Sequence, residues 1–384
     1  MLALRPRSAR ITGLLAATAV SSLALVTTTP AMAVTGPETP ADAHPYAVQL
    51  HLGDDASARA CTGTLVDRFW IMTAASCFAT TPGSPVSSGK PVLKASAALG
   101  NGKAVDLIEI VVRAERDAAL LRLAKPVVDL KTAKVAASAP APGPDLTAVG
   151  FGRTKTQWVP GKPHTGTFTV KSTDATTLAL AGKGTDALCK GDTGGPLVNA
   201  AGELVGVNSR SGQGGCLGTP ATETRTEAVS TRVDGLGEWV QQVRLTTASV
   251  QNANSQRCLF VGWRTPENNA PALQADCDPQ FADQLWKFEP VAGGGYQVRN
   301  AYNNRCLLVS WRTPEEGAPV TQYDCHPNYS DQVWKLEPVD GGGYQIRNAL
   351  SNRCMYVSWR TPEVGAPVVQ VDCDPRYADQ VWKV

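Results

Sequence analysis

The sequence predicts an all-β protein built from two unlike parts. In the first part, short runs rich in Val, Leu and Ile are separated by Gly, Pro, Asp and Ser turns. Runs such as Ala47–Leu52 alternate between apolar and polar residues, as half-buried strands do. One helical pattern occurs there, over 235–245. The second part, 248–384, contains three copies of one repeat that recurs every 48 residues.

The first 33 residues have the features of a secretory signal peptide. Three arginines precede an apolar run over 11–26, and the small residues of 31–33 supply a cleavage site. A transmembrane anchor is disfavoured because the run is short and is interrupted by Ser21 and Ser22. We therefore expect a secreted, extracellular protein.

The charge balance argues against polyanionic partners. The chain carries 36 basic and 34 acidic residues, and the leader holds three of the arginines and no acid. The mature chain is therefore close to neutral, and it offers no broad basic surface to a phosphate backbone or an anionic bilayer. We expect neither nucleic acid nor a membrane as a partner.

Ten cysteines in a secreted chain predict five disulfides. The last six cysteines form three pairs, each 19 residues apart, which recur with the repeat. The expected bridges are Cys61–Cys77, Cys189–Cys216, Cys258–Cys277, Cys306–Cys325 and Cys354–Cys373. Zinc is disfavoured because no Cys-x2-Cys spacing occurs and only four histidines exist, of which His326 alone lies near a cysteine pair. We expect no metal site and no cofactor.

The segment 189–196 reads Cys-Lys-Gly-Asp-Thr-Gly-Gly-Pro. A backbone that aims two N–H groups at one oxyanion needs conformations and close approaches that side chains forbid, which explains the glycines. The segment resembles the nucleophile loop of trypsin/chymotrypsin-like serine proteases, with Thr193 in the place of the serine. The resemblance implies that Gly191 and Thr193 donate the oxyanion hydrogen bonds. The alternative is a glycine-rich turn between strands.

Three further segments extend this resemblance over 34–245. The segments 61–66 and 70–77 resemble the family's first cysteine strand and its Thr-Ala-Ala-His-Cys segment, with Ser76 in the place of the catalytic histidine. The segment 116–123 resembles the buried aspartate segment and keeps the triad acid at Asp117. The family resemblance implies a double β-barrel closed by a C-terminal helix.

The substitutions indicate impaired catalysis. A serine hydroxyl such as that of Ser76 is far too weak a base near neutral pH to take the proton of the nucleophile. The extra methyl group of Thr193 crowds a pocket that normally holds serine. Losing the base or the nucleophile costs on the order of 10⁶ in turnover, or roughly 8 kcal/mol of barrier. The alternative is a displaced base, for which the candidates are His44, His51 and His164.

The resemblance also implies a specificity pocket and a buried N-terminus. Either Asp186 or Ala187 falls at the pocket base, because one residue more than usual separates the acid from Cys189. Asp186 there favours a basic side chain, whereas Asp186 in a solvated loop has no such role. In the family a new N-terminus pairs with the aspartate before the nucleophile, which predicts a pair between Val34 and Asp192. The alternative is a frayed Val34, with Asp192 bonded to local backbone N–H groups.

The repeats 248–295, 296–343 and 344–384 are each too small to bury a core alone, so we expect pseudo-threefold closure. Each contains Arg-Cys, Trp-Arg-Thr-Pro-Glu, a second Cys and Asp-Gln-x-Trp. The pattern resembles the ricin B-type β-trefoil, which carries one Gln-x-Trp in each repeat. The family resemblance implies that these tryptophans lie in the core and that the module binds carbohydrate.

The usual sugar-binding aspartate is replaced by Phe260, Leu308 and Tyr356, and the stacking aromatic survives only as Tyr323. Other polar and aromatic residues recur at equivalent positions. The candidate glycan contacts are Trp263, Gln274, Asp283, Trp311, Gln322, Tyr323, Asp331, Trp359, Gln370 and Asp379. The recurrent tryptophan is either a ligand platform or packing under a loop.

Three functions compete. The first is a protease homologue with impaired catalysis that a glycan-binding trefoil targets to a polysaccharide or glycoconjugate, with a peptide or protein ligand in the cleft. The second is an active endopeptidase with Thr193 as nucleophile and a lectin module. The third is a non-enzymatic scaffold that binds another protein. Ser76 and Thr193 favour the first or the third.

Overall fold

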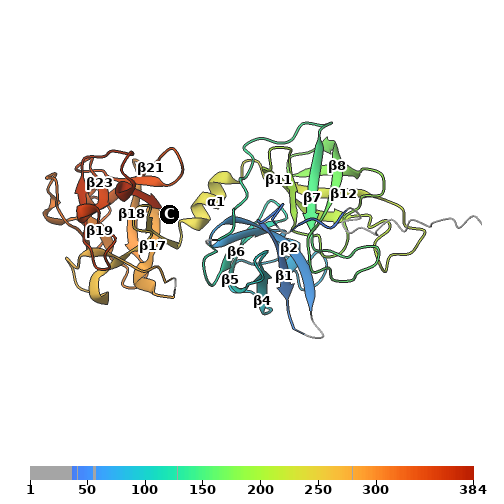
Figure 1. Cartoon of the computed structure of the whole chain (residues 1–384), viewed down its shortest axis with the longest axis horizontal. Coiled ribbons are helices and arrows are strands. Elements are labelled where there is room, and N and C mark those ends of the chain that lie inside the picture. Colours follow the sequence, from blue (N-terminus) through green and yellow to red (C-terminus); the bar gives the residue numbers. More distant parts are fainter. Residues whose placement is uncertain (1–36, 41, 55–57, 128, 279) are drawn as a thin grey trace, which may run out of the picture. The chain divides into compact units, whose positions relative to one another are not determined.

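The computed structural model describes residues 37–40, 42–54, 58–127, 129–278 and 280–384. The predicted leader and Val34 lie outside these residues. Within the described part of the chain, no helix is long and apolar enough to cross a membrane. The predicted all-β fold with one closing helix is confirmed by the described elements (Figure 1).

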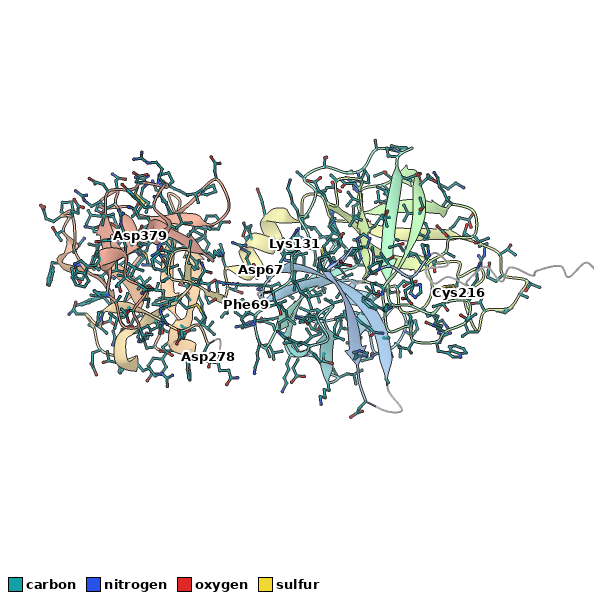
Figure 2. The ribbon with its side chains drawn as sticks, in the orientation of Figure 1. Asp67, Phe69, Lys131, Cys216, Asp278 and Asp379 are labelled. Carbon is teal, nitrogen blue, oxygen red and sulfur yellow. A yellow bond between two sulfur atoms is a disulfide. The ribbon has the colours of Figure 1, made fainter. Side chains whose placement is uncertain are left out.

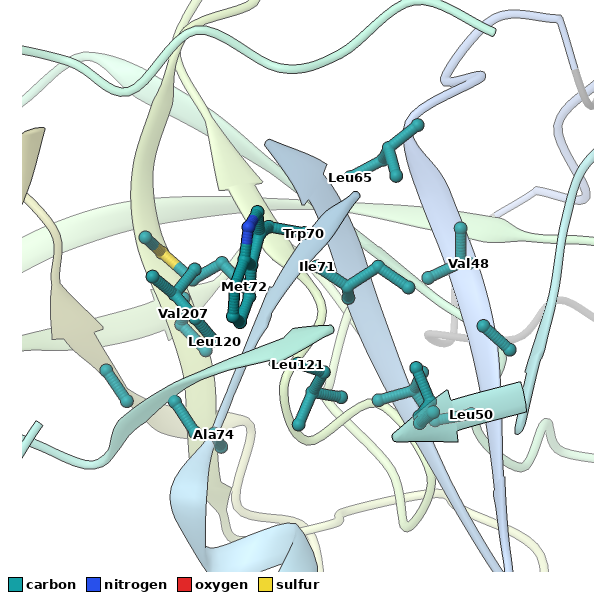
Figure 3. Close-up of a cluster of buried hydrophobic side chains, with 14 of the residues drawn as sticks. Val48, Leu50, Leu65, Trp70, Ile71, Met72, Ala74, Leu120, Leu121 and Val207 are labelled. Carbon is teal, nitrogen blue, oxygen red and sulfur yellow. The ribbon is translucent and has the colours of Figure 1, made fainter. Parts of the chain in front are cut away.

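The first barrel contains six antiparallel strands in the closed order β1-β2-β3-β6-β5-β4. Its strands are β1 (Ala47–Leu52), β2 (Arg59–Asp67), β3 (Trp70–Thr73), β4 (Ala95–Ala98), β5 (Ala104–Arg113) and β6 (Ala118–Leu123). Apolar side chains from facing strands fill this barrel, and Ile71 of β3 lies among them near Leu50 and Leu121 (Figure 3). Gly63 allows this packing, because a Cβ there would lie 2.5 Å from Cγ2 of Ile71.

The second barrel closes in the order β10-β11-β12-β9-β8-β7. Its strands are β7 (Asp145–Gly150), β8 (His164–Thr173), β9 (Thr177–Gly182), β10 (Pro196–Val198), β11 (Leu204–Ser211) and β12 (Glu227–Arg232). After it comes α1 (Gly237–Arg244), which buries Trp239, Val240 and Val243 and so occupies most of the predicted helical segment. Barrel closure leaves the two barrels without exposed sheet edges.

The repeats build one sheet system with the main order β13-β17-β18-β21-β22-β25-β14-β15-β16. Strand β25 of the last repeat pairs with β14 of the first, with Trp382 opposite Asn252, so the chain closes on itself. The strands are β13 (Ala248–Ser249), β14 (Gln251–Asn252), β15 (Cys258–Val261), β16 (Ala272–Ala275), β17 (Leu285–Pro290), β18 (Tyr296–Asn300), β19 (Cys306–Val309), β20 (Val320–Tyr323), β21 (Val333–Pro338), β22 (Tyr344–Asn348), β23 (Cys354–Val357), β24 (Val368–Val371) and β25 (Val381–Lys383).

The tryptophans of the three Gln-x-Trp motifs lie in a shared core. Trp286, Trp334 and Trp382 are fully buried. Each indole N–H donates to a carbonyl of its own repeat, at 3.0, 3.0 and 2.9 Å respectively. A buried indole N–H needs an acceptor, and the carbonyl of the same repeat provides it, so this bond fixes each tryptophan in its core position.

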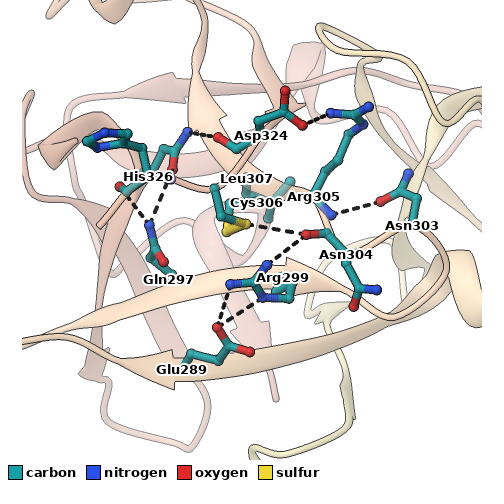
Figure 4. The surroundings of a disulfide bond; sticks show 12 residues. Glu289, Gln297, Arg299, Asn303, Asn304, Arg305, Cys306, Leu307, Asp324 and His326 are labelled. Carbon is teal, nitrogen blue, oxygen red and sulfur yellow. Dashed lines mark hydrogen bonds and ion pairs between the residues drawn. A yellow bond between two sulfur atoms is a disulfide. The ribbon is translucent and has the colours of Figure 1, made fainter. Parts of the chain in front are cut away.

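The five predicted disulfides are present. Cys216, labelled in Figure 2, is bonded to Cys189 beside the nucleophile loop. In the second repeat, ion pairs of Arg305 with Asp324 and of Arg299 with Glu289 surround the bridge (Figure 4). Each bridge within a repeat closes a short loop and stabilises the fold by about 3 kcal/mol in the chain-entropy estimate.

Candidate active-site cleft and trefoil loops

The nucleophile loop is held against the first barrel by its glycines. Gly191 has φ +104° and Gly194 has φ +87°, conformations that side chains rarely adopt. A Cβ on Gly194 would lie 2.0 Å from Oγ1 of Thr73 and 2.2 Å from the carbonyl oxygen of Thr62. The loop therefore lies directly on β2 and β3, where only glycine fits at position 194.

Thr62 on β2 fixes the loop by three hydrogen bonds. Its N–H donates to the carbonyl of Thr193 at 2.9 Å, and its hydroxyl donates to the carbonyl of Gly191 at 2.8 Å. The same hydroxyl accepts from the N–H of Phe151 at 3.0 Å. Because Thr62 is fully buried, its two bonds to the loop hold the nucleophile position, and the bond from Phe151 ties the same side chain to the end of β7.

The three triad positions lie around one carboxylate. Ser76, on the 3-10 helix η2 (Ala75–Phe78), donates its N–H to Oδ1 of Asp117 at 2.8 Å and its hydroxyl to Oδ2 at 2.9 Å. Ser209 on β11 donates its hydroxyl to the same Oδ2 at 2.6 Å. The Thr193 hydroxyl donates to the carbonyl of Ser209 at 3.4 Å. The nucleophile position is thus linked to Asp117 only through Ser209.

Ser209 was not among the residues singled out from the sequence. It is one of two serines near the end of β11, and nothing in the sequence distinguishes it from Ser211. Its importance appears only when β11 is placed beside the loop that carries Asp117.

None of the histidines occupies the position of the missing base. Nδ1 of His44 lies 3.1 Å from the Tyr46 hydroxyl, His51 is exposed on β1, and His164 is buried on β8 opposite Gly150. His326 lies in the repeat domain and stacks on Tyr329 at 4.0 Å. The hydrogen bonds that the structure gives Asp117 come from Ser76 and Ser209 alone.

The two amides expected to form the oxyanion hole have no acceptor within the described chain. The N–H groups of Gly191 and Thr193 donate to none of the residues that the structure describes. Two adjacent unpaired donors on a rigid loop can bind a carbonyl or carboxylate oxygen from outside the chain. Both N–H groups are therefore available to an acceptor from outside the described residues.

Asp192 belongs to this loop, and its side chain is fully buried. Its carboxylate accepts from the N–H groups of Gly152 and Cys189, both at 2.7 Å. Burial raises the pKa of Asp192 to about 7, and the two N–H bonds offset part of that effect. A Cβ on Gly150 would lie 2.0 Å from Oδ1 of Asp192, so that position requires glycine. The pair with Val34 stays a prediction, because Val34 lies outside the described residues.

A pocket of about 360 Å³ opens beside Thr193. Leu188 and Cys189 line it, in place of the predicted Asp186 and Ala187. Asp186 is held away from it, because its Oδ2 accepts from the N–H of Thr167 on β8 at 2.7 Å. Ala187 is fully buried. The pocket therefore lacks the acidic base that would select a basic side chain.

Residues 33–240 match the protein-family model described as Trypsin, which covers more than half of the chain. The chain belongs to the trypsin family. Residues 246–382 match the model described as Ricin-type beta-trefoil lectin domain, so a lectin β-trefoil follows the trypsin-like domain. A lectin domain of this kind implies carbohydrate binding in general.

Among solved structures, the chain is similar to the one described as "Crystal structure of designed 3-fold symmetric protein, ThreeFoil". The identity is 21%, the match covers 36% of this chain and 96% of that chain, and the TM-score is 0.35. A search of curated proteins found no match.

The three recurrent glutamines of the trefoil lie inside it. Gln274, Gln322 and Gln370 are at most 1% exposed. Nε2 of Gln322 donates to the carbonyls of Thr265 and Glu267 in the preceding repeat, at 2.9 and 2.7 Å. Gln274 and Gln370 make the equivalent bonds across the other two repeat junctions. These amides hold the Trp-Arg-Thr-Pro loops against neighbouring repeats, and they present no surface to a sugar.

The three recurrent aspartates pair with the arginines of those loops. Asp283, Asp331 and Asp379 (labelled in Figure 2) are at most 4% exposed. They lie 3.5, 3.3 and 3.4 Å from Nε of their arginines, which are Arg264, Arg312 and Arg360. Each arginine also lies over an aromatic ring of its own repeat, at 3.9, 4.3 and 4.0 Å. Burial raises the pKa of Asp331, and the charge of Arg312 opposes that shift.

The loop tryptophans point into solvent. Trp311 is 81% exposed and Trp359 is 78% exposed, and both have φ +57°. The arginines that follow also have positive φ, so each loop holds two successive side-chain-bearing residues in a left-handed conformation. The exposure of these indoles excludes packing under a loop. The Trp263 side chain lies outside the described part, and Tyr323 is 37% exposed.

Among the described residues, no three His, Cys, Asp or Glu side chains are placed to hold a metal ion together.

Proposed function

We propose that this protein is a secreted trypsin homologue with impaired catalysis, whose cleft binds peptide segments and whose trefoil binds glycans. One observation carries the catalytic part of this proposal. Ser76 occupies the place of the base, and its hydroxyl donates to Asp117 at 2.9 Å. An aliphatic hydroxyl in this position is far too weak a base near neutral pH to take the proton of Thr193.

The remaining cleft supports binding rather than turnover. The Thr193 hydroxyl donates to the carbonyl of Ser209. The N–H groups of Gly191 and Thr193 have no acceptor among the described residues, so they can donate to a ligand. An oxyanion hole with substrate binding alone accelerates hydrolysis by only about 10³ to 10⁴ over water. A cleft of this kind binds a peptide carbonyl and releases it unchanged.

The trefoil proposal is supported by the exposed indoles. A tryptophan face that is some four-fifths exposed binds the apolar face of a sugar ring or remains an unused hydrophobic surface. Positive φ at a bulky residue costs of order 1 to 3 kcal/mol, and such strain is concentrated at binding sites. Three equivalent loops would raise the affinity for a polymeric glycan by avidity.

The catalytic proposal is tested by restoring the triad in the full chain. The Ser76→His, Thr193→Ser double variant should cleave members of a panel of peptide and protein substrates that the wild-type leaves intact. Ser76→Asn with Thr193→Ser is the matched control, because it adds a side chain of similar size that is no base. Comparable activity in the wild-type would instead support the second candidate, an endopeptidase with Thr193 as nucleophile.

The glycan proposal is tested by pull-down on chitin, cellulose, xylan and cell-wall material, together with a glycan array. The wild-type chain should be retained by at least one polymer, and Trp311→Ala with Trp359→Ala should release it. Val364, which is 57% exposed on the same domain, supplies the control variant Val364→Ala. Absence of retention on every matrix would remove the glycan-binding proposal.

A further inference from the structure

We infer that the pocket beside Thr193 selects an acidic side chain, so that the cleft binds peptides through a Glu or Asp residue. This inference rests on the proposed peptide-binding function of the cleft. The pocket is lined by two cationic residues, Lys190 and Arg210, and by no acidic residue. Selection of an acid is the opposite of what Asp186 at the pocket base would have given.

Both cations are available to a ligand. Lys190 and Arg210 are exposed, and neither forms an ion pair with a carboxylate in the part of the chain that the structure describes. Lys190 directly precedes Gly191, one of the two expected oxyanion donors. Arg210 follows Ser209 on β11, and both cationic residues line the pocket. A carboxylate in the pocket would be attracted by both charges.

None of the residues that line the pocket carries a carboxylate, and the acids elsewhere in the site bond to other groups. Asp192 accepts from two buried backbone N–H groups behind the loop. Asp117 accepts from Ser76 and Ser209. Glu223, which lines the adjoining pocket, pairs with Arg225, whose Nε lies 2.8 Å from Oε1.

The far end of the pocket is closed by uncharged groups. The Ser211 hydroxyl donates to the carbonyl of Leu188 at 2.6 Å, and the disulfide of Cys189 continues the wall. The lining therefore offers a lysine or arginine side chain uncharged acceptors but no carboxylate partner. The volume of about 360 Å³ is ample for a glutamate side chain.

The test measures binding by fluorescence anisotropy, so it does not depend on catalysis. Four labelled hexapeptides with amidated C-termini share one sequence and differ at a single position, which is Glu, Gln, Lys or Phe. The full chain should bind the Glu peptide most tightly, and its preference over Gln should shrink as salt is raised. Lys190→Gln and Arg210→Gln should each weaken binding of the Glu peptide by about twofold to fivefold, because both charges are exposed.

The control variant is Lys171→Gln on β8, which removes the same charge from an exposed position outside the pocket. An equal effect of Lys171→Gln would show that net charge alone is responsible and would overturn the inference. Equal binding of all four peptides overturns the inference but leaves the peptide-binding function standing. No binding of any peptide overturns both. If a Gln peptide with a free C-terminal carboxylate bound more tightly than the amidated Glu peptide, the pocket would select a terminal carboxylate. That result would overturn the inference that it selects an acidic side chain.

Discussion

Ser76 bonds Asp117 twice, through its backbone N–H at 2.8 Å and through its hydroxyl at 2.9 Å. The triad acid is therefore satisfied without an imidazole. With the bond from Ser209, Asp117 accepts three hydrogen bonds and so helps to hold η2 and β11 together.

We predict that Ser76→Ala lowers the free energy of unfolding by about 1 kcal/mol, the size of one hydrogen bond to a charged acceptor at an exposed site. Urea denaturation of the full chain measures the change. Ser87→Ala is the control, since Ser87 is exposed on the same barrel. Equal midpoints for the Ser76 and Ser87 variants would mean that the hydroxyl bond to Asp117 contributes nothing.

The loop tryptophans offer a second prediction. At φ +57° glycine carries no steric penalty, so Trp311→Gly should raise the stability of the trefoil by about 1 kcal/mol relative to Trp311→Ala. Both variants should lose glycan retention equally, because both remove the indole. Thermal unfolding beside the pull-down separates the two effects. A glycine variant less stable than the alanine variant would show that this backbone is not strained.

The sequence was sufficient for the fold and the disulfides, because each rests on residue identity and spacing. Gly191, Thr193 and Gly194 are read directly from one segment, and the hydrogen bonds of Thr62 place that segment on β2. The three repeats likewise predict closure through the buried Trp286 and its equivalents.

The sequence was insufficient where side-chain direction decides the role. Gln322 and Trp311 recur with equal regularity, yet one is buried and the other is 81% exposed. Trp311 also has positive φ, and the sequence gives no sign of this conformation when the residue is not glycine. Because of the extra residue before Cys189, the sequence did not decide whether Asp186 or Ala187 lies at the pocket base. The hydrogen bond from Thr167 to Asp186 answered the question, since it holds Asp186 away from the pocket.

Gln322 leads to the third prediction. Its Nε2 bonds two carbonyls and its Oε1 accepts from Asn303 at 2.8 Å, all inside the trefoil. Gln322→Ala should destabilise the domain by roughly 2 to 3 kcal/mol, because it leaves these partners unsatisfied. Glycan retention below the melting temperature should remain, as no atom of Gln322 faces a ligand. Loss of retention in a variant that is still fully folded would assign Gln322 to the sugar contacts.

The last prediction concerns Asp192 and the new N-terminus at Val34. With local N–H partners alone, burial raises the pKa of Asp192 to about 7, above the ordinary value of 3.8. An acid whose folded pKa is raised contributes stability that is present at low pH and is lost as pH rises from about 4 through about 7. A buried ammonium from Val34 would lower that pKa instead, and stability would then be lost as pH falls.

We therefore expect the chain that begins at Val34 to keep its stability as pH rises from about 4 to 7. A chain with one extra residue ahead of Val34 should lose stability over the same range, since its ammonium cannot reach Asp192. Asp192→Asn should remove the pH dependence of the extended chain, whatever it does to absolute stability, because the amide does not titrate. Urea unfolding at several pH values measures the slopes. Identical slopes for the two chain lengths would show that the ion pair does not form and that Cys189 and Gly152 alone hold Asp192 in place.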